Sequence, residues 1–182
     1  GLLVAIKSEI FVALRTFASK LIVTAPALVA ATQLILVKLT EAGQQTRDSI
    51  LGGSSFEQSV ANNAYGFFVD GLTTGLTMLG LLLVAQGAYS FSYDRDVGSI
   101  RHLLIRRVSR SSVLTAKLIH LHLLAALSAL LLLATSYLLS GMLWEYGAIV
   151  EDGFELISEQ EIREEIGLGL RLALVPLPAA IA

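Results

Sequence analysis

Apolar and polar positions alternate in long blocks along this chain, and four of the blocks are apolar enough to enter a membrane. The apolar runs cover residues 21–37, 67–91, 118–140 and 168–182. An α-helix rises ~1.5 Å per residue and a bilayer core is ~30 Å thick, so a span needs about 20 apolar residues. We therefore predict an all-α fold, a polytopic transmembrane helix bundle with three spans and the start of a fourth at 168–182.

Residues 2–19 precede the first span. Their apolar residues recur at helical spacing instead of forming one continuous apolar run. Leu2, Ile6 and Ile10 fall on one helical face, with Ser8 and Arg15 opposite. This pattern predicts an amphipathic helix at the membrane interface. A cleaved signal peptide is the alternative, but Glu9 and Arg15 interrupt the apolar core that such a peptide needs.

Proline and glycine residues mark special points within the predicted spans. Pro26 lies inside the first span and predicts a bend, or an open hydrogen bond that a neighbouring helix must cover. Small residues in the second span predict close approach of another helix; these are Gly71, Gly75, Gly80 and Gly87.

Two features of the segment after the third span predict local structure. Trp144 is expected to anchor the outer membrane surface. Ser158 and Glu161 have the spacing of a capping box, and Ile162 and Ile166 follow at helical spacing. We expect a short outer helix that leads into the fourth span.

The charges are segregated along the chain. Residues 93–117 carry only two acidic side chains, Asp94 and Asp96, against six basic ones, namely Arg95, Arg101, Arg106, Arg107, Arg110 and Lys117. Acidic residues gather instead between 145 and 165. Short loops rich in Lys and Arg stay in the cytoplasm, so we predict a cytoplasmic N-terminus and a cytoplasmic segment 93–117, with 39–65 and 141–166 outside.

Composition supports a membrane protein and argues against an enzyme. The 182 residues are 54% hydrophobic and 15% charged, which is too apolar for an ordinary soluble domain. There is no cysteine and no phosphate-binding loop, and neither the three histidines nor the serines fall into a metal-binding or nucleophilic motif. We expect no catalysis, no cofactor in this chain and no nucleic-acid partner. Because the chain begins at Gly and stops inside an apolar run, we expect it to be truncated at the C-terminus.

The basic segment contains a second amphipathic pattern, at residues 94–108. Val97, Ile100, Leu104 and Val108 form one helical stripe, and polar side chains form the opposite one. This pattern predicts a helix lying along the cytoplasmic membrane surface, between the second and third spans.

The same segment resembles the first cytoplasmic loop of the type-two export permeases of ATP-binding cassette transporters. The resemblance rests on an acidic Asp94, then Gly98-Ser99, Leu103-Leu104, Ser109-Arg110 and finally Lys117. The family often has Pro where this chain has Arg107, so the local turn differs. In that family the loop forms a coupling helix that docks on the ATPase subunit. By resemblance the coupling residues here are Asp94, Val97, Gly98, Ser99, Ile100, Leu103, Leu104, Arg110 and Lys117.

The resemblance also implies the number of spans, the partner subunits and the cellular location of the chain. The family has six spans, of which about four would be visible here, and an elbow helix that corresponds to 2–19. ATP and Mg would be bound by a partner ATPase subunit, and a second permease subunit would complete a homodimer or heterodimer. The implied location is the bilayer of a prokaryotic cytoplasmic (inner) membrane, and the implied function is export.

Two alternatives remain open at this stage. Asp70 is the only charge in the second span and could line a polar pathway, but it lies so near the interface that simple hydration is favoured. The whole chain could instead be a non-transporting membrane anchor or assembly subunit. Its basic loop would then only bind anionic lipid, at ~1 kcal/mol per Lys or Arg.

Overall fold

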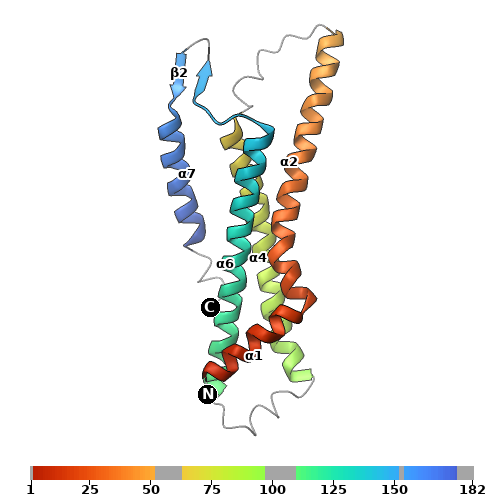
Figure 1. Cartoon of the computed structure of the whole chain (residues 1–182), viewed down its shortest axis with the longest axis vertical. Helices are drawn as coiled ribbons and strands as arrows, with labels where there is room; N and C mark the ends of the chain where they lie inside the picture. Colours follow the sequence, from red (N-terminus) through yellow and green to blue (C-terminus); the bar gives the residue numbers. More distant parts are fainter. Residues whose placement is uncertain (1, 52–62, 97–109, 152–153, 176–182) are drawn as a thin grey trace.

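The structure is a computed structural model that describes residues 2–51, 63–96, 110–151 and 154–175. The helices are α1 (Leu2–Arg15), α2 (Phe17–Leu51), α4 (Ala64–Asp96), α6 (Arg110–Leu143) and α7 (Glu159–Leu174). Two short strands, β1 (Ile149–Glu151) and β2 (Phe154–Ile157), lie between α6 and α7. Helices α2, α4 and α6 stand side by side as a bundle, and α1 crosses one end of it (Figure 1).

Three of these helices are long and apolar enough to cross a membrane. The qualifying segments are Phe17–Gly43, Ala64–Tyr89 and Ser111–Leu143, with mean hydropathies of 1.9, 1.8 and 2.1. Each exceeds the ~20 residues that a span requires. The prediction of a membrane helix bundle is confirmed at this level.

The helices extend beyond the predicted spans of 21–37, 67–91 and 118–140. Helix α2 continues to Leu51, through a segment for which we predicted only polar outer sequence. Residues such as Glu41, Ala42 and Gln44 favour helix without being apolar, so the helix outlasts the hydrophobic run. Hydropathy therefore located the spans and underestimated the helices.

Small residues allow α4 to approach its neighbours. A Cβ atom on Gly75 would collide with the side chain of Leu132 in α6, and one on Gly71 would lie 3.2 Å from Leu34 in α2. The predicted close approach is thus correct at these two glycines. At Gly80 and Gly87 no described residue from another part of the chain would come within 4 Å of a Cβ atom.

Pro26 creates the open hydrogen bond that its position predicts, and α6 closes it. Proline has no N–H group, so the carbonyl of Ile22, four residues earlier, loses its helical donor. Ser128 of α6 donates its hydroxyl to this carbonyl at 2.9 Å. Both Pro26 and Ser128 are fully buried, so the bond is made inside the bundle, as predicted.

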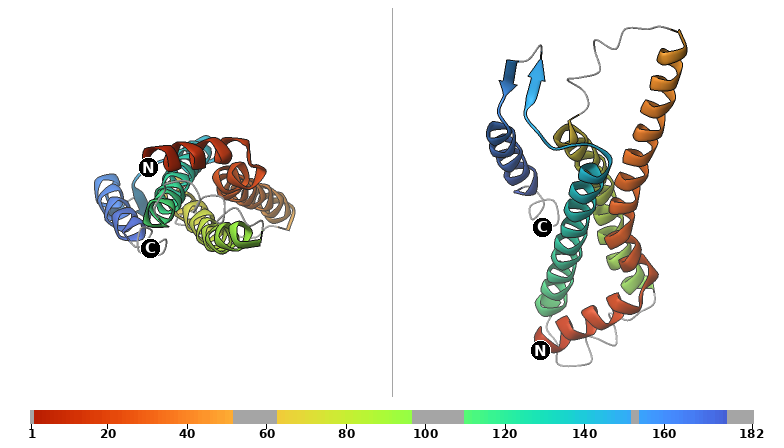
Figure 2. Two further views of the ribbon diagram at one scale, coloured as in Figure 1. Left: turned by 90° about the horizontal axis from the view of Figure 1, so that it is seen from below. Right: turned by 45° about the horizontal axis from the view of Figure 1, so that its top comes forward.

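Helix α1 is shorter than the predicted interfacial helix 2–19. It ends at Arg15, and residues 17–19 already belong to α2. Thr16 donates its hydroxyl to the Val12 carbonyl at 2.7 Å, a bond that commonly bends helices. The chain turns there, and α1 lies across the lower end of the bundle (Figure 2).

The β-hairpin departs from the all-α prediction. Strands β1 and β2 pair in antiparallel fashion, with Val150 opposite Glu155. The signal in the sequence was Asp152-Gly153, a hairpin-turn dipeptide, between stretches containing β-branched and aromatic residues. We had interpreted the acidic residues of this stretch only as a sign that 141–166 lies outside.

Helix α7 begins where the capping box predicts. The Glu161 N–H donates to the Ser158 hydroxyl at 3.3 Å, and the Ser158 N–H donates to the Glu161 carboxylate at 3.1 Å. The predicted helix after the capping box is therefore confirmed, and its location outside the membrane stays a prediction. It ends at Leu174, and residues 176–182, which complete the predicted start of a fourth span, lie outside the described residues.

Candidate functional site

The predicted coupling helix, residues 94–108, falls mostly outside the described residues. Asp94 lies in the last turn of α4, and Arg110 is the first residue of α6. The other coupling residues up to position 104 are not described, namely Val97, Gly98, Ser99, Ile100, Leu103 and Leu104. The end of α4 and the start of α6 both lie at the end of the bundle that α1 crosses (Figure 1).

Lys117, the last of the predicted coupling residues, joins α6 to α1. Its ammonium lies 3.5 Å from a carboxylate oxygen of Glu9. The Lys117 side chain is only 7% exposed and that of Glu9 is 26% exposed. Breaking a pair buried to this degree is far more costly than losing an exposed pair. The two helices are therefore tied together at this end.

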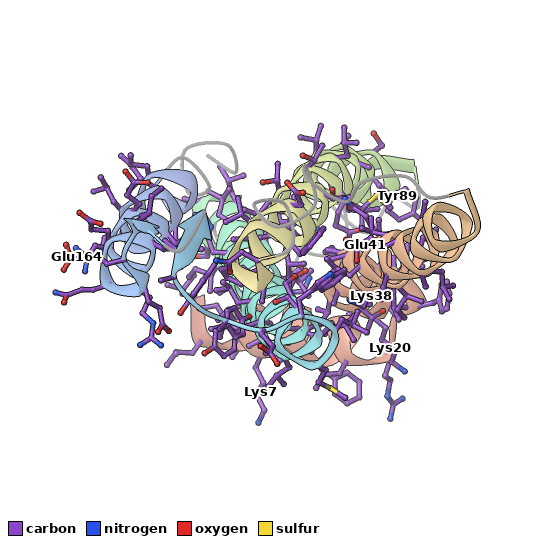
Figure 3. All side chains as sticks on the ribbon, turned by 90° about the horizontal axis from the view of Figure 1, so that it is seen from above. Lys7, Lys20, Lys38, Glu41, Tyr89 and Glu164 are labelled. Carbon is purple, nitrogen blue, oxygen red and sulfur yellow. The ribbon has the colours of Figure 1, made fainter. Side chains whose placement is uncertain are left out.

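A second polar cluster lies at the opposite end of the bundle, around Trp144. The indole N–H donates to Glu41 at 2.9 Å, and the ring stacks on Phe67 with centroids 3.9 Å apart. Lys38 lies over the indole ring at 4.8 Å and pairs with Glu41 at 3.6 Å; Lys38 and Glu41 lie next to each other in Figure 3. Trp144 is 6% exposed, so its ring is covered by other parts of the chain, and its expected role as an anchor at the outer membrane surface stays a prediction. Trp144 joins α2, α4 and α6.

The segment after α6 is fixed to the start of α4. Asn63 donates its side-chain amide to the Gly147 carbonyl at 2.7 Å, and the Ala64 N–H donates to the Glu145 carbonyl at 3.2 Å. Tyr146 donates its hydroxyl to the Tyr137 carbonyl at 2.7 Å. Burial raises the pKa of the Tyr146 hydroxyl, which keeps it neutral and available as a donor.

Helix α7 is held to α4 by a three-residue latch, formed by Tyr65, Glu159 and Arg163. The Tyr65 hydroxyl donates to Glu159 at 2.9 Å and accepts from the Arg163 Nε at 2.7 Å, while Arg163 also pairs with Glu159. The hydrogen bonds from Tyr65 and Arg163 lower the pKa of the Glu159 carboxyl. The bonds to Tyr65 and Glu159 raise the pKa of the Arg163 guanidinium. Both charges are therefore retained over a wide pH range.

Asp70 lines a groove between α4, the hairpin and α7. The groove has a volume of about 390 Å³. Asp70 and Glu165 are the carboxylates among its described lining residues, and apolar side chains such as Ile149 and Ile162 form much of the rest. Asp70 is exposed, and both the polar pathway and simple hydration stay predictions. The groove combines negative charge with an apolar wall, which suits an amphipathic cation better than an anion.

Several residues at these contacts gave no functional signal in the sequence. Glu9 counted only as a charge that interrupts a signal peptide, and Tyr65 and Arg163 lie 98 positions apart. Whether two residues so far apart in the sequence form a hydrogen bond depends on where α7 packs against the bundle.

Comparisons with known proteins add no family to this picture. No protein-family model, curated protein or solved structure matches the chain.

Proposed function

We propose that this chain is a membrane-spanning permease subunit of an ATP-binding cassette exporter. ATP and Mg are bound and hydrolysed on a separate ATPase subunit, and residues 94–108 receive the motion of that subunit. A second permease subunit completes the pathway. The proposal extends the resemblance of the loop sequence, and the bundle supports it by the placement of the elements around that loop.

The observation that carries the proposal is the arrangement of α4 and α6. These two helices pack together, and their ends at Asp96 and Arg110 flank the basic segment at one end of the bundle. A partner that moved this segment would pull on two long helices at once. Since a helix rises ~1.5 Å per residue, each helix extends far enough to carry such a displacement to the opposite membrane surface.

The packing makes α4 and α6 suitable as a rigid lever. Gly75 admits the Leu132 side chain so closely that no Cβ atom would fit between them. Leu79 and Leu132 are completely buried in the interior of the bundle. Close-packed interfaces of this kind resist small deformations and shift as units.

The ion pair between Glu9 and Lys117 extends the lever to α1. It joins the elbow helix to α6 seven residues after α6 begins at Arg110. Movement of α6 therefore carries α1 with it along the membrane surface. In this proposal Lys117 transmits motion within the permease, rather than through direct contact with the ATPase.

Partner capture by variants of the loop tests the proposal. Ile100→Asp or Leu104→Asp places a carboxylate in the apolar stripe, at a cost of several kcal/mol if that stripe is buried against protein. These variants should lose an ATPase that co-purifies with the wild-type chain from native membranes. Arg101→Gln and Arg106→Gln are the matched controls and should retain it, because exposed ion pairs are worth only ~0 to 1 kcal/mol.

The non-transporting anchor predicts the opposite ranking. In that case the Arg variants weaken binding to anionic vesicles in a salt-sensitive manner, and no ATPase is captured by any chain. Equal retention of the ATPase by the wild-type, Ile100→Asp and Leu104→Asp chains would contradict docking through the apolar stripe.

A further inference from the structure

A groove lies on the membrane-facing surface where α1, α2 and α6 meet. Its volume is about 330 Å³, within the range of sites that hold small molecules or parts of larger ones. Its α2 residues, 19–24, begin two residues after the membrane-spanning segment starts at Phe17, whereas its α6 residues, 120–127, begin nine residues after that segment starts at Ser111. The groove therefore extends from the end of the α2 span, where lipid headgroups lie, toward the acyl chains.

The walls of the groove are formed largely by leucine side chains that are exposed on the surface of the chain. Leu14 of α1 is 70% exposed, and Leu123 and Leu127 of α6 are 51% and 56% exposed. Val23 of α2 completes this wall. Exposed apolar side chains on a span are normally covered by acyl chains, and the concave shape lets one chain be enclosed on more than one side.

The described lining of the groove carries one positive charge and no carboxylate. Lys20 is the only permanently charged residue in that lining. Within the described residues Lys20 forms no salt bridge, while the carboxylate of Glu9 is already paired with Lys117. His120 and the buried Ser19 add further hydrogen-bonding groups to the lining.

We propose that this groove binds a single anionic phospholipid. One acyl chain lies along Leu14, Leu123 and Leu127, and the headgroup phosphate binds the Lys20 ammonium. Charge complementarity selects the anionic headgroup, and the leucine wall selects a lipid over a free anion. The bound lipid would fill the angle between α1 and the bundle and hold α1 in place, which is separate from any docking of an ATPase.

Lipid titration of the purified chain tests the proposal. The protein is stripped of lipid in detergent and titrated with phosphatidylglycerol or phosphatidylcholine of identical acyl chains, and the bound lipid is counted by native mass spectrometry. We expect the wild-type chain to bind one phosphatidylglycerol in preference to phosphatidylcholine. Lys20→Gln should weaken phosphatidylglycerol binding about fivefold, the effect of one basic side chain near an anionic headgroup, and leave phosphatidylcholine binding unchanged.

Lys7→Gln is the matched control, because Lys7 is an exposed lysine on α1 that does not line the groove. Figure 3 shows Lys7 and Lys20 at separate places on the edge of the molecule. The Lys7→Gln chain should keep wild-type affinity for phosphatidylglycerol. Val23→Trp fills the groove and should weaken binding of both lipids, while circular dichroism checks that each variant retains its helix content.

Three results would overturn the proposal. Equal phosphatidylglycerol binding by the wild-type and Lys20→Gln chains would remove Lys20 from the site. Equal losses in Lys20→Gln and Lys7→Gln would indicate general surface electrostatics. Displacement of the lipid by millimolar inorganic phosphate would indicate a site for the free anion rather than for a lipid.

Discussion

Ser128 supplies the hydrogen bond that Pro26 withholds from Ile22, and this bond can be tested at the scale of single residues. Ser128→Ala leaves the buried Ile22 carbonyl without a donor, which should lower the free energy of unfolding by about 1 kcal/mol. Ser136 is the matched control, because it is equally buried on α6 and its hydroxyl has no partner within the described residues. Ser136→Ala should change stability much less.

The same bond predicts a rescue. Pro26→Ala restores an N–H group four residues after Ile22, so the Ile22 carbonyl regains a helical donor. The Pro26→Ala/Ser128→Ala double variant should therefore be less destabilised than the sum of the single changes, measured by thermal unfolding in detergent. Strict additivity would contradict the link between the proline and the serine.

Gly75 and Gly80 give a second prediction at the residue scale. Gly75→Ala places a methyl group against the fully buried Leu132 and should destabilise the bundle by about 1–3 kcal/mol. Gly80→Ala meets open space in the same helix and should be neutral or stabilise it by up to ~1 kcal/mol, because alanine favours helix. Unfolding midpoints of the two variants provide the comparison, and equal effects would contradict the assigned α4–α6 interface.

At the scale of elements, the latch of Tyr65, Glu159 and Arg163 should control whether α7 stays on the bundle. Tyr65→Phe removes the hydroxyl that bonds both other residues. Hydrogen exchange should accelerate in α7 and stay unchanged in the interior of α2 and α6. Tyr137→Phe is the matched control, because its described hydrogen bonds use the backbone carbonyl, and it should leave α7 protected.

The latch also predicts a pH dependence with a definite sign. The pKa of Glu159 is lowered from its usual 4.5 in the folded chain, so its contribution to α7 docking is present above that value. It is lost as the pH falls through the lower, folded pKa. Protection of α7 should thus be constant from neutral pH down to 4.5 and fall in more acid solution. A decline that begins at neutral pH would contradict a role for Glu159.

Sequence patterns predicted elements better than they predicted contacts between elements. The apolar runs located three spans, and the Ser158 and Glu161 pair located the start of α7, because both depend on residues near each other in the chain. The partners of Trp144 and Lys117 come from other helices, so no local pattern contained them. The hairpin was missed because we interpreted the acidic residues between 145 and 165 only as a sign of an outer location.

At the scale of the whole molecule, the membrane orientation can be tested with single cysteines, since the chain has none of its own. We predict that Ser54→Cys and Glu164→Cys react with an impermeant thiol reagent added outside intact cells. Ser111→Cys should react only after the membrane is opened, because it lies beside the basic segment. If only Ser111→Cys were labelled from outside, the chain would have the opposite orientation, which would contradict the exporter proposal.

The proposed exporter depends on a contact between the basic segment and an ATPase, and site-specific photo-cross-linking in living cells measures that contact. A photoreactive side chain at Ile100 should capture a protein that contains a phosphate-binding loop, whereas the same group at Glu164, on α7 at a distance from the segment, should not. If Ile100 yields only lipid adducts while the chain is correctly inserted, residues 94–108 do not couple to an ATPase and the chain is not a permease of this class.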